Sequence, residues 1–136
     1  MIDVVAAVIK KNNYYFIAQR NRNKHFAYHF EFPGGKVDNQ ETFENALKRE
    51  IKEELAINIR ILHLIASEKH KDEKIDVNVH YYLCKSLNEN IILSEHEDMN
   101  WLQKNDLKQL KMAPGDSKII KYCRDQTFIV TLRGYN

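Results

Sequence analysis

Short apolar runs separated by polar clusters cover most of the chain. Runs that are rich in β-branched and aromatic residues and bounded by polar residues predict β-strands. They lie at residues 2–9, 14–20, 57–67 and 75–84, with shorter runs at 91–93 and 101–102 and a last one at 127–132. The first two flank Lys10-Lys11-Asn12-Asn13, which is typical of a hairpin turn. The pattern therefore predicts a sheet that opens with a hairpin.

One longer segment has helical periodicity instead. Its apolar residues recur at near-helical spacing, at Phe43, Ala46, Leu47, Ile51 and Leu55. Thr42 precedes them and is a suitable N-cap, so we expect a helix from there to about Leu55, after a turn at Pro33-Gly34-Gly35. Two shorter helices are predicted at 105–110 and 117–124.

Length and composition fit one globular domain covering residues 1–136. The start of the chain has no basic leader, and its apolar run is too short to span a membrane, so we expect a cytoplasmic protein. Cys84 and Cys123 are far apart and outside any metal-ligand spacing, which predicts two buried free thiols. A net charge of +2 argues against a nucleic-acid polymer as partner and permits a small polyanion.

The predicted long helix carries an unusual set of acids. At about 100° per residue, Glu50, Glu53 and Glu54 fall within an arc of about 100° that overlaps the edge of the apolar stripe. A merely solvated acidic face would lie opposite that stripe, where Lys48 and Lys52 lie instead. The acids are therefore expected to be partly drawn toward the core.

Crowded, half-buried carboxylates must protonate, pair with cations or bind a metal ion, because an unpaired buried charge is costly. Arg49 alone cannot neutralise three acids. A set of oxygen ligands without Cys or His suits a hard ion, Mg²⁺ or Mn²⁺, which commonly also binds phosphate oxygens. The sequence therefore points to phosphate chemistry.

The same residues carry a family resemblance. Gly35, Glu41, Arg49-Glu50 and Glu53-Glu54 have the spacing of the Nudix box, and the chain resembles the Nudix hydrolases over nearly its whole length. Two positions depart from the usual pattern: Ala56 replaces the Gly that ends the helix, and Gln40 replaces a frequent Gly. "EFPGGKV" and the stretch 112–116 look like the MutT branch, which hydrolyses nucleoside triphosphates to monophosphate and pyrophosphate. The resemblance implies an α/β fold, the α/β/α sandwich around a mixed β-sheet.

The resemblance also implies roles for individual residues. The divalent ions would be held by Glu50, Glu53, Glu54, Glu95 and the backbone carbonyl of Gly34. Arg49 would orient Glu53, and Glu41 would have a supporting role. Either Glu50 or Glu95 would take the proton of the attacking water, although Glu95 also fits a solvated charge run.

Substrate contacts implied by the resemblance fall on Arg20, Phe32 and Asp116. Asp116 would read the base edge, but it is also a plausible N-cap for the last helix. Arg20 would meet phosphate or base, or be an ordinary surface residue. His25, His29 and His96 are interpreted as loop or rim residues.

The nucleotide itself is left open by these residues. An Asp accepts from the exocyclic amine of guanine or cytosine, so 8-oxo-dGTP is the leading substrate, and CTP or 5-methyl-dCTP is the alternative. A nucleoside diphosphate derivative such as ADP-ribose is a third possibility, and a nucleotide-binding module without activity a fourth. A monomer or a homodimer would fit, with no membrane as partner.

Overall fold

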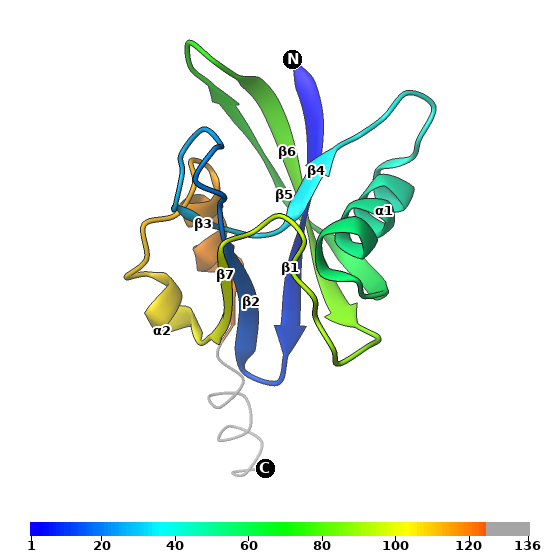
Figure 1. Cartoon of the computed structure of the whole chain (residues 1–136), viewed down its shortest axis with the longest axis vertical. Coiled ribbons are helices and arrows are strands. Elements are labelled where there is room, and N and C mark those ends of the chain that lie inside the picture. Colours follow the sequence, from blue (N-terminus) through cyan, green and yellow to red (C-terminus); the bar gives the residue numbers. More distant parts are fainter. Residues whose placement is uncertain (125–136) are drawn as a thin grey trace, which may run out of the picture.

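The chain forms a sheet of seven strands with helices on both sides (Figure 1). The computed structural model describes residues 1–124. The strands are β1 (Ile2–Lys11), β2 (Tyr14–Gln19), β3 (Phe30–Glu31), β4 (Gly34–Lys36), β5 (Ile59–Lys71), β6 (Asp76–Ser86) and β7 (Asp98–Leu102). The helices are α1 (Phe43–Leu55), the short α2 (Lys104–Leu107) and a 3₁₀ helix, η1 (Asp116–Tyr122).

The sheet is mixed. Its main path runs β3-β2-β1-β6-β5, while β4 adds to β1 and β7 adds to β2. Only the central pair, β1 with β6, is parallel; the other pairs among the described strands are antiparallel. The opening hairpin of β1 and β2 is confirmed, and the strands predicted at 57–67 and 75–84 form a second hairpin, β5 with β6.

Alternation along β1 divides the core into two layers. Val5, Ala7 and Ile9 face α1, whereas Ala6 and Val8 face the side of α2 and η1. The α1 layer includes Ala46, Leu47, Ile51, Leu55 and Cys84, and the other layer includes Tyr81, Leu107, Ile119, Ile120 and Cys123. The α/β/α sandwich around a mixed sheet is thus confirmed, as is the burial of both free cysteines.

Helix α1 begins and ends as its sequence predicts. The Thr42 hydroxyl accepts a hydrogen bond from the Asn45 N–H at 3.1 Å, which caps the first turn. Ala56 closes the helix in the left-handed conformation, with φ of 58°. An L-residue with a Cβ is disfavoured there by about 1 kcal/mol relative to Gly, so this helix end carries a small strain.

The strand predicted at 91–93 is wrong. Backbone N–H groups of this segment instead satisfy carbonyls at the end of α1, from Ile92 to Leu55 at 3.0 Å and from Ser94 to Glu54 at 3.1 Å. A helix leaves its last carbonyls without partners, and this segment supplies them. The segment therefore lies against α1 and leads directly into Glu95.

The Pro-Gly-Gly turn also needs correction, because Gly34 and Gly35 belong to β4. Gly34 lies opposite Ala6 of β1, and a Cβ on Gly34 would come within 1.9 Å of the Val5 carbonyl oxygen. The glycine is required by close backbone approach rather than by turn geometry.

Other boundaries shift by a few residues. β5 starts two residues later than predicted and continues to Lys71 because it pairs with β6 along nearly its full length. The last helix is a 3₁₀ helix whose N-cap is Gly115. The predicted strand 127–132 lies outside the described residues.

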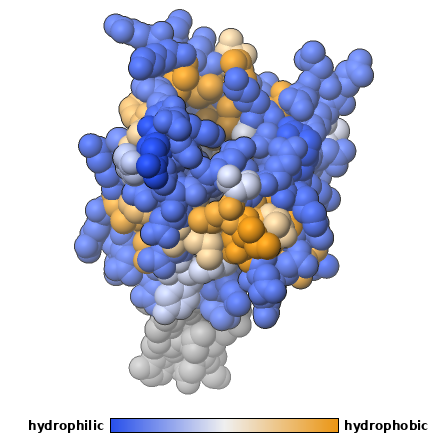
Figure 2. All heavy atoms as spheres, in the orientation of Figure 1, coloured by the Kyte–Doolittle hydropathy of each residue, from blue (hydrophilic) through white to orange (hydrophobic). Residues whose placement is uncertain are grey.

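The face shown in Figure 2 is mainly hydrophilic, with apolar atoms gathered in smaller patches. Among residues 1–124, no helix is both long and apolar enough to cross a membrane.

Candidate active site

Helix α1 presents its acids beside β4. A Cβ added to Gly35 would lie 2.3 Å from the Glu50 carboxyl carbon, so the absence of a side chain there makes room for this carboxylate. Burial raises the pKa of Glu50, and the charges of Glu53 and Glu95 act in the same direction, against the opposing contact with Arg49. Strand β4 and helix α1 together therefore place a partly desolvated carboxylate at the sheet surface.

Arg49 is the cation at the centre of the acids. It binds both carboxylate oxygens of Glu41, at 2.7 and 3.0 Å, and Glu50 at 2.9 Å. Its contact with Glu53 is longer, at 3.4 Å, and the Glu53 side chain is more than half exposed. The hydrogen bond with Glu41 is the main cause that raises the pKa of Arg49. In this arrangement Arg49 holds Glu41 and Glu50 more closely than Glu53.

Glu54 is the most deeply buried acid of the helix. It is only 2% exposed, and its Oε2 has no hydrogen-bond partner within residues 1–124. Burial raises its pKa to about 9, and the charges of Glu31, Glu50 and Glu95 add to the effect. A buried hydrogen-bond acceptor without a partner is unusual in a native protein. A bound cation would supply the partner that Oε2 of Glu54 lacks.

Glu95 is brought to this cluster by the segment that follows α1. The Ser94 hydroxyl donates to the Glu53 carbonyl at 2.8 Å, and the Asn21 amide donates to the Glu95 carbonyl at 3.1 Å. The side chain of Glu95 pairs with Lys24 at 3.5 Å and is half exposed. Its backbone is fixed from both sides while its carboxylate lies at the rim.

The donor set fits a hard divalent ion, although it is not assembled around one. Within residues 1–124, no three His, Cys, Asp or Glu side chains are arranged so that they could hold a metal ion together. Arg49 instead binds Glu50 and contacts Glu53. The chemistry nevertheless matches, because the ligands are all oxygens and the buried Oε2 of Glu54 has no other partner.

A hollow of about 240 Å³ borders on β4, and one of its lining residues, Gly35, also lies against the Glu50 carboxylate. The three predicted substrate contacts, Arg20, Phe32 and Asp116, all line it, together with Gly34. These residues come from three separate segments of the chain, so only the tertiary structure brings them together.

Asp116 is a buried pocket residue and not an N-cap. Its Oδ2 accepts the Phe32 N–H at 2.9 Å, its Oδ1 accepts a short hydrogen bond from the Tyr81 hydroxyl, and its side chain makes no capping bond to η1. Burial raises the pKa of Asp116 to about 7, and the nearby charge of Glu31 acts the same way. The carboxyl is thus held rigidly at the pocket wall.

Glu31 and His96 are site residues that the sequence reasoning missed. The Glu31 carboxylate binds Arg20 Nη1 at 2.6 Å and His96 Nε2 at 2.8 Å. Burial opposes the ionisation of Glu31, but the hydrogen bond from His96 and the charge of Arg20 outweigh it and lower its pKa. His96 lies in the loop before β7, as one of the two predicted alternatives has it, but its side chain is almost fully buried, so it is not a rim residue. The sequence did contain a signal for Glu31, which is a charged residue between two aromatic residues, Phe30 and Phe32, at the short strand β3.

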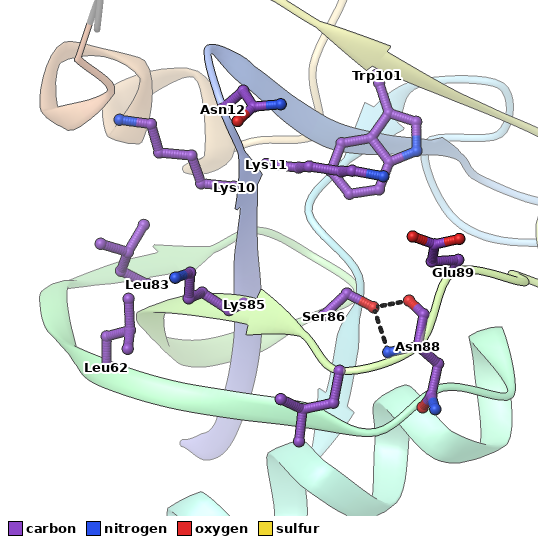
Figure 3. Close-up of a pocket in the computed structure, with 11 residues that line it drawn as sticks. Lys10, Lys11, Asn12, Leu62, Leu83, Lys85, Ser86, Asn88, Glu89 and Trp101 are labelled. Carbon is purple, nitrogen blue, oxygen red and sulfur yellow. Dashed lines mark hydrogen bonds between the residues drawn. The ribbon is translucent and has the colours of Figure 1, made fainter.

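A second hollow, of about 490 Å³, lies at the far end of β1 (Figure 3). Lys10 and Lys11 at the end of β1 lie on one side of it, together with Asn12 of the following turn and Trp101, and Leu83 and Lys85 lie on the other side. None of the predicted site residues lines this hollow, so its size does not make it the reaction centre.

Comparison with known proteins identifies the class to which this fold and acidic helix belong. The family model described as "NUDIX domain" matches residues 1–123. The chain therefore belongs to the Nudix family, and it is a Nudix hydrolase.

Comparison with individual relatives indicates the branch of the Nudix family to which the chain belongs. The chain is 30% identical over 121 residues to the CTP pyrophosphohydrolase of Escherichia coli K12, covering 89% of this chain and 90% of that protein. It is 29% identical to the 8-oxo-dGTP diphosphatase of Haemophilus influenzae, over 93% and 94% of the two chains. The crystal structure of a MutT Nudix hydrolase from Burkholderia pseudomallei superposes with a TM-score of 0.80 at 25% identity, over 88% of this chain and 95% of that one. The chain is thus a Nudix hydrolase of the MutT-like branch, a group that acts on nucleotides.

Proposed function

We propose that this enzyme is a Mg²⁺-dependent nucleoside triphosphate pyrophosphohydrolase with 8-oxo-dGTP as its leading substrate, which it converts to the monophosphate and pyrophosphate. One observation carries the proposal: a buried carboxylate suited to a base edge, Asp116, lines the same hollow as Arg20, directly beside the acids of α1. A nucleotide in this hollow would place its base against Asp116 and its phosphates toward Glu50 and Glu54.

The acids would hold the divalent ions, and one of them would also accept a proton. Glu50, Glu53, Glu54, Glu95 and the Gly34 carbonyl would hold the divalent ions, Mg²⁺ or Mn²⁺. Bound ions would offset phosphate charge and lower the pKa of a water molecule.

The chain itself supplies the proton acceptor. Glu50 is suited to that role because it is partly desolvated and its pKa is raised by burial, which makes it a stronger base than an exposed Glu. Glu95 is the other candidate. Arg49 keeps Glu50 oriented through a 2.9 Å hydrogen bond and is itself anchored by Glu41.

Recognition of the nucleobase would depend on the lone pairs that remain free on Asp116. Each carboxylate oxygen can accept two hydrogen bonds, and Tyr81 and the Phe32 N–H use only one on each. An exocyclic amine of guanine could use another. The aromatic ring of Phe32, which packs edge-on against Tyr81, adds an apolar wall.

Cytidine nucleotides are the second candidate. The relative named CTP pyrophosphohydrolase matches at 30% identity over most of both chains, and the cytosine amine is as good a donor to Asp116 as the guanine amine. A nucleoside diphosphate derivative such as ADP-ribose is the third candidate, since adenine also has an exocyclic amine that could donate to Asp116.

The test is a substrate panel with Mg²⁺: 8-oxo-dGTP, dGTP, CTP, 5-methyl-dCTP and ADP-ribose, with release of pyrophosphate and the second product both measured. We expect pyrophosphate from 8-oxo-dGTP, and a loss of at least about 100-fold in Glu53→Gln. Preference for cytidine nucleotides would transfer the assignment to CTP. Sugar phosphate products without pyrophosphate would overturn the triphosphate reading, and equal inactivity of wild type and variant on every nucleotide would overturn the proposed reaction.

A further inference from the structure

The loop from residue 21 to 28, between β2 and β3, forms one wall of the nucleotide hollow. Lys24 and Phe26 of this loop line it, and His70 and Ile75 of the β5–β6 hairpin line it from another side. Figure 1 shows the blue loop reaching up toward the turn of the green hairpin. The width of the hollow therefore depends on how these two segments are held together.

His25 of the loop contacts Asp72 of the hairpin, and His70 of the same hairpin contacts the same oxygen of Asp72. His25 Nε2 lies 2.9 Å and His70 Nε2 lies 3.3 Å from the same oxygen, Asp72 Oδ2. An ionised carboxylate can only accept hydrogen bonds, so both imidazoles carry a hydrogen on Nε2. The hydrogen bond from His25 is the main cause that lowers the pKa of Asp72, which agrees with this ionised state.

The hairpin turn fixes the direction of Asp72. Its Oδ1 accepts the N–H groups of Lys74 at 2.7 Å and Ile75 at 2.9 Å, and its own N–H donates to the Ile75 carbonyl at 2.9 Å. With one oxygen held by two amides, the other is aimed at the histidines. Asp72 is therefore a rigid anchor on the hairpin.

Ring packing and backbone strain show that the loop is held in a specific shape. Phe26 has φ of 58°, a left-handed conformation that a bulky residue adopts only when its surroundings impose it. Its ring lies 4.0 Å from that of His25, and 6.0 Å from that of His70, between ring centroids. These contacts keep the strained residue in place against the hairpin.

The contact between His25 of the loop and Asp72 of the hairpin, called the clasp below, also extends to Arg20 through the backbone of His25. The carbonyl of His25 accepts Arg20 Nε at 2.8 Å, while Glu31 accepts Nη1 at 2.6 Å. Among residues 1–124, Nη2 of Arg20 has no hydrogen-bond partner, and Arg20 lines the hollow. The position of His25 thus sets the direction in which this remaining donor group points.

We propose that Asp72 is a positioning residue for nucleotide binding, which holds the 21–28 loop against the β5–β6 hairpin through His25 and thereby orients Arg20. The inference rests on the proposed function, since it assumes a nucleotide in this hollow. Asp72 itself would touch neither the acids of α1 nor the base. Its loss should therefore weaken substrate binding and leave the chemical step intact.

The test compares Asp72→Ala and His25→Phe, singly and together, with Glu73→Ala as matched control. Glu73 is exposed on the same turn, whereas His25→Phe keeps a ring beside Phe26 and leaves the Asp72 turn bonds intact. We expect each test variant to raise KM about tenfold with kcat within twofold of wild type. The double variant should be no worse than Asp72→Ala alone, because both substitutions remove the same contact between His25 and Asp72. Unchanged KM in His25→Phe, or additive effects in the double variant, would overturn the proposal.

A second measurement does not depend on activity. Trypsin can cut after Arg22 and Lys24, and release of the loop should make these bonds more accessible. We expect cleavage there to be at least about fivefold faster in Asp72→Ala and His25→Phe than in wild type and Glu73→Ala. If wild type hydrolysed no nucleotide but this difference appeared, the proposed function would fail while the clasp stood. Equal cleavage in all four proteins would overturn the clasp itself.

Discussion

Glu54 should make the metal-free enzyme less stable as the pH rises. Its folded pKa is about 9, whereas an unfolded Glu titrates near 4.5. A carboxyl with a raised folded pKa binds its proton more tightly in the native state, so its contribution to stability is complete below about pH 4.5. That contribution is lost progressively as the pH rises toward 9.

The size of this loss in unfolding free energy follows from the interval between the folded and unfolded pKa values of Glu54. Each pH unit between these two pKa values costs about 1.4 kcal/mol of unfolding free energy, so the loss between pH 5 and pH 8 is about 4 kcal/mol. Asp116 also has a raised pKa and contributes in the same direction, up to about pH 7. The comparison must therefore be made against a variant that changes Glu54 alone.

The assay is urea unfolding in EDTA at several pH values, for wild type, Glu54→Gln and Glu53→Gln. Glu54→Gln cannot titrate, so its free energy of unfolding should fall about 4 kcal/mol less than that of wild type between pH 5 and pH 8. Glu53→Gln removes an exposed carboxylate of the same helix and should follow the wild-type curve. Identical pH dependence in wild type and Glu54→Gln would refute the reasoning. Added Mg²⁺ should flatten the wild-type curve, because an ion binds the deprotonated carboxylate.

Three further predictions concern the helix and its partners. Ala56→Gly should stabilise the protein by about 1 kcal/mol in urea unfolding, because it removes the left-handed strain at the helix end; a destabilised variant would contradict this. Gly35→Ala should fold but lose most of its kcat, because the new methyl group displaces the Glu50 carboxylate, and an unchanged kcat with an unchanged circular dichroism spectrum would argue against that contact. Arg49→Lys should lower kcat at least about tenfold, since a lysine cannot bind both oxygens of Glu41 while holding Glu50; full activity would show that charge alone suffices.

Features that depend on residues close together in the sequence were the most predictable. Helix α1 and its Thr42 cap follow from local periodicity and capping preference, which depend on neighbours within a few residues. The acids at the edge of its apolar stripe were predicted for the same reason. Glu54 is buried and Glu50 partly so, whereas Glu53 is exposed.

Residues 91–93 show where local patterns fail. Three apolar residues in a row fit a strand, yet the free carbonyls at the end of α1 offered better partners than any sheet edge. Asp116 is a similar case, because it has the residue type and position of an N-cap but bonds instead to Tyr81 and Phe32, which are remote in sequence. Both outcomes were decided by competing hydrogen-bond partners that only the folded chain supplies.

The residue pattern was enough to predict the family, the acid-bearing helix and the types of group proposed for the reaction. These depend on short spacings along one helix and on residue chemistry. Only the folded chain shows that Glu31 joins Arg20 to His96, that Asp116 lines the same hollow as Arg20 and that Asp72 reaches the loop at His25. Such contacts join segments up to 84 residues apart, and burial then sets their pKa values, so neither the partners nor the charges follow from local sequence.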